Sequence, residues 1–184
     1  NNNLLAHELS PSISQLEDSI CKWFSNKIGF TESAGGIAAS GGTLSNLNAL
    51  VAARNYAGLE SDHNAVYITS EDAHSSFVKC CQIMGISKNN LIKVKSDNNG
   101  CMDIVDLEKL IDKCYEEGKK IFSIVATLGT TIRGAIDPIE KISKICKERN
   151  IWLHIDGSIG GIFAITKIPI NGISNVNFAN SITI

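Results

Sequence analysis

Short apolar runs alternate along the chain with stretches in which apolar residues return every three or four positions. The runs are typical of buried β-strands, and the strongest of them cover residues 65–69, 91–94, 121–126 and 151–156. A weaker run of small residues, 36–39, predicts one more strand. The intervening stretches predict amphipathic helices, which begin at 12, after 42, at 74, after 103 and after 137.

Polar residues mark the helix starts, and Gly29 and Gly118 mark two of the helix ends. The predicted caps are Ser12 with Gln15 as a capping box, Asp103, and Asp137 followed by Pro138 and Glu140. The predicted inner faces are Leu44, Leu47 and Val51 in the second helix, Leu107, Leu110 and Cys114 in the fourth, and Ile139, Ile142 and Cys146 in the fifth.

Strands that are apolar on both faces and alternate with amphipathic helices indicate a mostly parallel sheet covered by helices on both faces. The chain has 184 residues, which suffices for one sizeable core, and we find no internal repeat or linker. The predicted fold class is therefore α/β, and residues 1–184 form one domain or the greater part of one.

Composition removes several classes of function. Net charge is −2 and the lysines are scattered, so no basic stripe predicts a nucleic-acid partner. No apolar run reaches the roughly 20 residues that span a membrane. The first residues lack both a methionine and the basic start of a signal peptide. We therefore expect a cytoplasmic protein and a sequence that begins inside a longer chain. The six cysteines have no metal-ligand spacing, which favours reduced, buried thiols and no metal site.

Candidate chemistry follows the ends of the predicted strands, where parallel α/β sheets bind ligands. Gly41, Gly42 and Thr43 precede a helix, and they predict either a phosphate site or an ordinary tight turn. Asp156 ends the apolar run that starts at Ile151, so its carboxylate either pairs with a cationic ligand or caps a neighbouring loop.

Two histidines and two threonines are further candidates. His74 follows a strand, and it either stacks on a ligand ring or caps its own helix. His154 shares a strand face with Asp156, and we interpret it as packed and hydrogen-bonded. Thr130 and Thr131 end the most apolar strand, where they either donate to a ligand or form a turn.

Taken in order, five motifs resemble the group II pyridoxal-phosphate-dependent decarboxylases, the family of the glutamate, aromatic-amino-acid and diaminobutyrate enzymes. The motifs are LSP with Leu16-Glu17, SGGTLSN running on to Ala52-Ala53-Arg54, AHSS with Lys79, ATLGTT with GAIDP, and WLHIDGSIGG. The resemblance covers nearly the whole chain. It implies the large domain of the fold-type I, aminotransferase-like architecture, with pyridoxal 5'-phosphate as cofactor.

The resemblance also implies roles for individual residues. Gly42, Thr43 and the Leu44 backbone would bind the cofactor's phosphate, and His74 would stack on its ring. Asp156 would pair with the pyridine nitrogen. The two remaining candidates are Thr131, for the phenolic oxygen or substrate, and Ser158, beside the ring.

The sequence departs from the family pattern at three places. Gly157 and Ser158 stand where many relatives have two alanines, and Asn180 stands where relatives usually have aspartate. The family continues past a segment like 181–184 into an Asp-x-His-Lys turn, whose lysine forms the Schiff base. We therefore expect a central fragment, inactive by itself, without the small C-terminal domain and the N-terminal dimerising segment.

The expected activity of the whole enzyme is α-decarboxylation of an L-amino acid to an amine and CO2, in a homodimer. The SGGTLSN motif leans toward the glutamate, cysteine-sulfinate and diaminobutyrate branch. Two alternatives remain: another fold-type I lyase, and a non-catalytic scaffold that keeps the fold.

Overall fold

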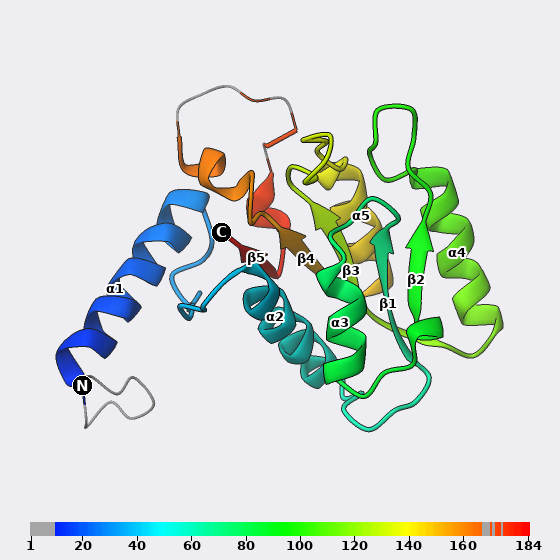
Figure 1. The fold of residues 1–184 in the computed structure, drawn as a ribbon, viewed down its shortest axis with the longest axis horizontal. Coiled ribbons are helices and arrows are strands. Elements are labelled where there is room, and N and C mark those ends of the chain that lie inside the picture. The colour runs from blue at the N-terminus through cyan, green and yellow to red at the C-terminus, as the bar shows by residue number, and fades with distance from the viewer. Residues whose placement is uncertain (1–9, 167–169, 171, 174) are drawn as a thin grey trace. The chain divides into compact units, whose positions relative to one another are not determined.

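The computed structural model describes residues 10–166, 170, 172–173 and 175–184. The chain divides into two compact units, Asn1–Ser40 and Gly41–Ile184. The second unit contains a parallel sheet of five strands in the order β2-β1-β3-β4-β5 (Figure 1). The strands are β1 (Ala65–Ser70), β2 (Leu91–Val94), β3 (Lys120–Thr127), β4 (Trp152–Asp156) and β5 (Ser181–Thr183).

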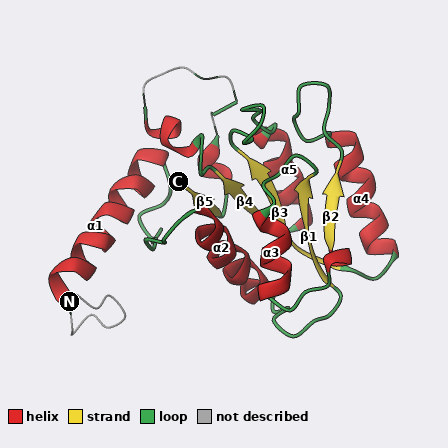
Figure 2. Cartoon of the chain, in the orientation of Figure 1, coloured by secondary structure: helices red, strands yellow, loops and turns green. Residues whose placement is uncertain are grey.

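Helices cover both faces of this sheet, as the sequence predicts (Figures 1 and 2). Helices α2 (Gly42–Tyr56) and α3 (Ser76–Ile83) lie on one face, and α4 (Ile104–Glu116) and α5 (Ile139–Arg149) lie on the other. This arrangement gives the right-handed crossovers that parallel strands require. Short 3-10 turns occur at Lys88–Asn90, Gly161–Ile165 and Val176–Phe178.

The main core lies between the sheet and the pair α2 and α3. Its central side chains are fully or almost fully buried: Leu50, Tyr67, Phe77, Phe122 and Val125. Every residue of β1 is buried, which is the pattern of a central parallel strand. Four predicted strands are therefore confirmed. The sequence analysis missed β5, which has only three residues.

The buried face of α2 differs from the predicted one. Leu44 is 42% exposed and Val51 is 40% exposed, whereas Asn46 and Leu50 are buried. Arg54 is also buried at 9% exposure, because its guanidinium donates to the backbone oxygens of residues 59, 62 and 84. Polar groups with partners thus occupy positions that a hydrophobic pattern cannot indicate.

Asp137 is not the helix cap that the sequence predicts. Its carboxylate is 1% exposed and accepts hydrogen bonds from the backbone N–H groups of Met102 and Thr127, both at 2.7 Å. Pro138 occupies the N-cap position of α5. Burial raises the pKa of Asp137 to about 6, and the two N–H donors oppose that shift. Asp137 therefore joins the end of β3 to the segment that leads into α4.

The cap of α4 is predicted correctly, since Asp103 accepts from the N–H groups of Val105 and Asp106. The inner face of α5 is also confirmed, with Ile139, Ile142 and Cys146 buried. In α4 the buried residues are Leu107, Ile111 and Cys114, so Ile111 takes the place predicted for Leu110.

In the first unit, α1 (Pro11–Ile28) begins one residue before the predicted cap. Ser10 is the N-cap and makes no capping bond, so the predicted capping box at Ser12 is wrong. Gly29 ends the helix in the left-handed region, as expected. The predicted strand at 36–39 is also wrong, because this segment is coil held by α1, where Ala38 donates its N–H to Glu17 Oε1 at 2.7 Å.

None of the helices in the described part of the chain is both long and apolar enough to cross a lipid bilayer. All six cysteines lie among the described residues and are free. Four of them, Cys80, Cys81, Cys114 and Cys146, are buried.

Candidate active site

A cavity of about 250 Å³ opens at the carboxyl ends of β3 and β4, next to the start of α2. From β1 the chain first forms β2, which pairs with one edge of β1, and then crosses back to form β3, which pairs with the other edge. In parallel α/β sheets, ligands bind near such a reversal of the strand order. The lining consists of Gly42, Thr43, Asn46, His74, Thr127, Gly129, Thr130, Thr131, Asp156, Ser158 and Ile159.

A second hollow, about 540 Å³, lies along α5 and the amino-terminal part of β4. Its lining includes Lys144, Lys147 and Phe178 but neither a carboxylate nor an imidazole. The smaller cavity is therefore the better candidate for acid–base chemistry.

The start of α2 forms one wall of the cavity. Leu44 and Ser45 donate their N–H groups to the Gly41 oxygen, whereas the N–H groups of Gly42 and Thr43 bond to no described residue. A side chain at Gly42 would overlap the Ser158 hydroxyl, so the helix start approaches β4 this closely only with glycine. Free N–H groups at the positive end of a helix dipole suit an anion such as phosphate.

Of the seven residues predicted to bind the cofactor, Leu44 is the one outside the cavity lining. Its N–H donates to Gly41, and its side chain points to solvent in part. The structure therefore gives the phosphate role of the Leu44 backbone less support than that of Thr43.

Asp156 ends β4 and is 6% exposed. Its Oδ1 accepts from the Ser158 hydroxyl at 2.7 Å and from the Ser158 N–H at 3.2 Å. No ion pair with a lysine or arginine of the described residues involves Asp156, and its carboxylate lines the cavity. A carboxylate without a protein cation favours a cationic partner from a ligand.

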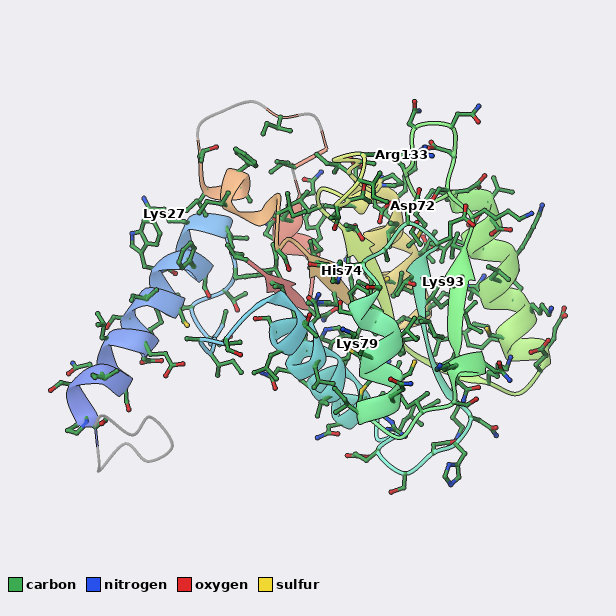
Figure 3. The ribbon with its side chains drawn as sticks, viewed as in Figure 1. Lys27, Asp72, His74, Lys79, Lys93 and Arg133 are labelled. Atoms are coloured by element: carbon green, nitrogen blue, oxygen red, sulfur yellow. The ribbon has the colours of Figure 1, made fainter. Side chains whose placement is uncertain are left out.

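His74 contacts the start of its own helix and also lines the cavity. Its Nδ1 accepts the N–H of Ser76, the first residue of α3, at 3.2 Å and lies 2.9 Å from the Ser76 hydroxyl. The ring also lines the cavity, and Figure 3 shows it beside the carboxyl ends of the strands. These bonds occupy Nδ1, which leaves Nε2 for a ligand.

The loop after β3 contributes threonines with different surroundings. Thr130 accepts the N–H of Ala135 through Oγ1 at 3.0 Å, so it stabilises the turn. Thr131 is exposed and lines the cavity. Thr127, which pairs with Asp156 across β3 and β4, has a buried Oγ1 without a hydrogen-bond partner among the described residues.

His154 is packed and hydrogen-bonded, as predicted. Its Nδ1 lies 2.9 Å from the Ser181 hydroxyl, and its Nε2 lies 3.0 Å from Asn46 Oδ1. Complete burial lowers the pKa of His154, although the nearby Asp156 carboxylate acts in the opposite direction. The imidazole is therefore neutral, and it connects β4 to α2 and β5.

Six of the seven predicted cofactor-binding residues thus line one cavity: Gly42, Thr43, His74, Thr131, Asp156 and Ser158. The sequence analysis did not select Asn46, Thr127, Gly129 or Ile159 as site residues. The signal for Asn46 was its position one helical turn after Gly42, on the same face of α2.

The cavity suits pyridoxal phosphate by the chemistry of its donors and acceptors. Unpaired N–H groups at Gly42 and Thr43 match a phosphate, and the Asp156 carboxylate matches a protonated ring nitrogen. The lining also contains Thr127, whose buried hydroxyl has no hydrogen-bond partner among the described residues.

Comparison with protein families agrees with this geometry. The family model described as "Pyridoxal-dependent decarboxylase conserved domain" matches residues 1–184. The chain belongs to this family. The family resemblance that the sequence motifs indicated is therefore confirmed, and so is the fold class.

Curated relatives include two decarboxylases with different substrates in their names. The chain is 36% identical to an acidic amino acid decarboxylase of Xenopus tropicalis over 168 residues, which are 88% of this chain and 33% of that protein. It is 31% identical to an aromatic-L-amino-acid decarboxylase of Bacillus atrophaeus over 171 residues, 92% of this chain and 35% of that protein. The chain thus spans about a third of the length of these relatives.

Solved structures show the same fold. Mouse CSAD superposes with a TM-score of 0.91 at 28% identity, covering 99% of this chain and 40% of that one. The glutamate decarboxylase domain of a Vibrio parahaemolyticus diaminobutyrate enzyme gives 0.91 at 28% identity, covering 99% and 42%. Tryptophan decarboxylase of Catharanthus roseus, solved with L-tryptophan, gives 0.87 at 26% identity, covering 96% and 40%.

Proposed function

We propose that this chain is the cofactor-binding part of an L-amino-acid α-decarboxylase that uses pyridoxal phosphate and yields an amine and CO2. The observation that carries the proposal is the meeting, in one cavity, of the free N–H groups of α2 with the Asp156 carboxylate. An anion site and a cation site so placed match the two charged ends of this cofactor. Its bound ring would supply the electron-withdrawing group that decarboxylation at an α-carbon needs.

The residues that line the cavity have different roles in this proposal. Gly42 and Thr43 bind the phosphate through N–H and hydroxyl donors. Asp156 holds a proton on the ring nitrogen, and Ser158 fixes the orientation of that carboxylate through Oδ1. By keeping the nitrogen of a bound ring protonated, this carboxylate would maintain the electron-withdrawing character of the ring, which is needed mainly in the transition state.

His74 and Thr131 complete the site. The Ser76 hydroxyl and N–H orient the His74 ring through Nδ1, so that Nε2 can hold or deliver a proton near the substrate. Thr131 offers a hydroxyl to an oxygen of the cofactor or substrate from the loop after β3.

The substrate we propose is an L-amino acid of the glutamate, cysteine-sulfinate and diaminobutyrate branch, because the phosphate loop reads SGGTLSN. The names of the relatives cover both acidic and aromatic substrates, so the family alone does not select one. We further propose that residues 1–184 form part of the large domain of a cytoplasmic homodimer.

The first experiment is a titration of the purified protein with pyridoxal phosphate, followed by absorbance of the bound cofactor. We expect saturable binding that inorganic phosphate weakens, because both anions use the start of α2. In a decarboxylating form of the protein, CO2 release is then measured from glutamate, cysteine sulfinate, diaminobutyrate and tryptophan. Binding that is absent, or indifferent to phosphate, would overturn the proposal.

A further inference from the structure

One buried amide in the cavity has an unused donor. Asn46 is 1% exposed and lines the cavity. Its Oδ1 lies 3.0 Å from His154 Nε2, and this is the only side-chain hydrogen bond of Asn46 within the described part of the chain, so Nδ2 donates to none of the described residues. A buried amide with a free N–H2 group costs stability unless a ligand or water accepts from it.

The orientation of the Asn46 side-chain amide follows from the hydrogen bonds that begin at Trp152. The Trp152 indole nitrogen can only donate, so the Ser181 hydroxyl accepts from it, at 2.8 Å. The proton of that hydroxyl then goes to His154 Nδ1, 2.9 Å away. His154 consequently has its proton on Nε2 and donates it to Asn46 Oδ1, which turns the amide nitrogen away from His154.

The opposite orientation of the Asn46 amide, with Nδ2 facing His154, is less favourable than this one. It would place a carbonyl oxygen in the lining that already contains the Asp156 carboxylate, and it would require the proton to move to His154 Nδ1. The Ser181 hydroxyl would then receive two donors and would have no acceptor for its own proton among the described residues. The neutral His154, whose pKa burial lowers, fits the first arrangement.

We propose that Asn46 is a further cofactor-binding residue, whose amide N–H2 donates to an acceptor oxygen of the bound pyridoxal phosphate, and that His154 positions it. This inference rests on the proposed function. Asn46 lies one turn after Gly42 on the same face of α2, so its amide is deeper in the cavity than the phosphate donors.

The test is the affinity for pyridoxal phosphate of variants at Asn46. Asn46→Ala should raise the Kd about 10- to 100-fold, the range for a lost hydrogen bond to a charged acceptor. Asn46→Asp keeps an acceptor for His154 but replaces the donor with a carboxylate oxygen, so its Kd should rise further. Asn48→Ala is the matched control, because Asn48 lies on the same helix outside the cavity lining.

Pyridoxal without phosphate locates the accepting oxygen. An equal loss with both ligands places it on the ring, and a loss confined to pyridoxal phosphate places it on the phosphate; either result supports the proposal. A Kd within twofold of the wild type in both Asn46 variants, with unchanged thermal unfolding, would overturn it. A wild type that binds no cofactor would instead remove the proposed function.

The positioning role of His154 has its own test. In His154→Gln the side-chain amide can still donate to Asn46 Oδ1, whereas His154→Leu offers no donor. We expect the Kd of His154→Gln to stay within a few-fold of the wild type and that of His154→Leu to rise about tenfold. Two variants with equal Kd values would contradict the positioning role.

Discussion

Asp137 and Asp156 are both buried carboxylates at the carboxyl end of the sheet, yet their surroundings differ completely. Asp137 gives one oxygen to the N–H of Met102 and the other to the N–H of Thr127. Asp156 uses Oδ1 for Ser158 alone and lines the cavity. Burial therefore does not distinguish a functional acid from a structural one, whereas the contacts of the two oxygens do.

The largest expected effect comes from Asp156. In a decarboxylating form of the protein, Asp156→Ala should lower turnover about 10²- to 10³-fold, the range for losing one preorganised electrostatic partner. It should retain measurable cofactor, because the phosphate donors remain. Steady-state CO2 release and cofactor absorbance measure both quantities. Near-normal turnover would remove Asp156 from the chemistry and make it resemble Asp137.

Asp137 should show the opposite behaviour. Asp137→Ala leaves two buried N–H groups without an acceptor, so the free energy of unfolding should fall by about 2–4 kcal/mol. Urea unfolding measures this loss. Asp72→Ala is the control, since Asp72 is exposed, and it should change stability by less than about 0.5 kcal/mol. Equal losses for both variants would mean that the two bonds of Asp137 add no stability.

The pH dependence of stability sharpens the contrast. The pKa of Asp137 is about 6 in the folded chain, whereas its ordinary value is 3.8. Between these two pH values the carboxyl group therefore loses its proton in the unfolded chain but keeps it in the folded chain. Rising pH therefore favours unfolding in this window, and the contribution of Asp137 to stability should fall by about 3 kcal/mol. The difference in unfolding free energy between the wild type and Asp137→Asn, measured from about pH 4 to about pH 7, isolates it. A constant difference would contradict the raised pKa.

The smallest expected effect is at Thr43. Its hydroxyl has no hydrogen-bond partner among the described residues, so Thr43→Val should leave stability unchanged. It should weaken cofactor binding by about 1–3 kcal/mol, because a phosphate oxygen loses a donor. Titration of the cofactor-free protein measures the change. Thr31→Val in the first unit is the control, and a loss of affinity there would point to an indirect effect.

The sheet was predictable because its central strands are long apolar runs, as in 121–126, that leave no other interpretation. The three residues of β5 were not, since so short a strand has no periodicity and depends on β4 for its pairing. The segment 36–39 failed for the opposite reason. Small apolar residues resemble a strand, but a side-chain carboxylate of α1 takes the N–H that a ladder would need.

The site residues were predictable where residue type and position together indicate a ligand-binding role. This holds for Asp156, His74 and Thr43, which lie at strand ends and helix starts. Asn46 gave only a positional signal, one helical turn after Gly42, because the hydrogen bond to His154 and the unused amide donor are visible only in three dimensions. Asp137 misled because Asp-Pro commonly begins a helix. Only the three-dimensional structure shows that its carboxylate turns toward the backbone of β3 instead.

The pairing of β5 with β4 also has a consequence for how the protein is made on the ribosome. Ser181 contacts both Trp152 and His154, residues that emerge well before it during synthesis. Until Ser181 arrives, the indole of Trp152 lacks its acceptor, and the imidazole of His154 can exchange between its two tautomers. The hydrogen bonds that orient His154, and through it Asn46, are thus completed only after the rest of the described sheet has been translated, which links assembly of the site to late, non-local contacts.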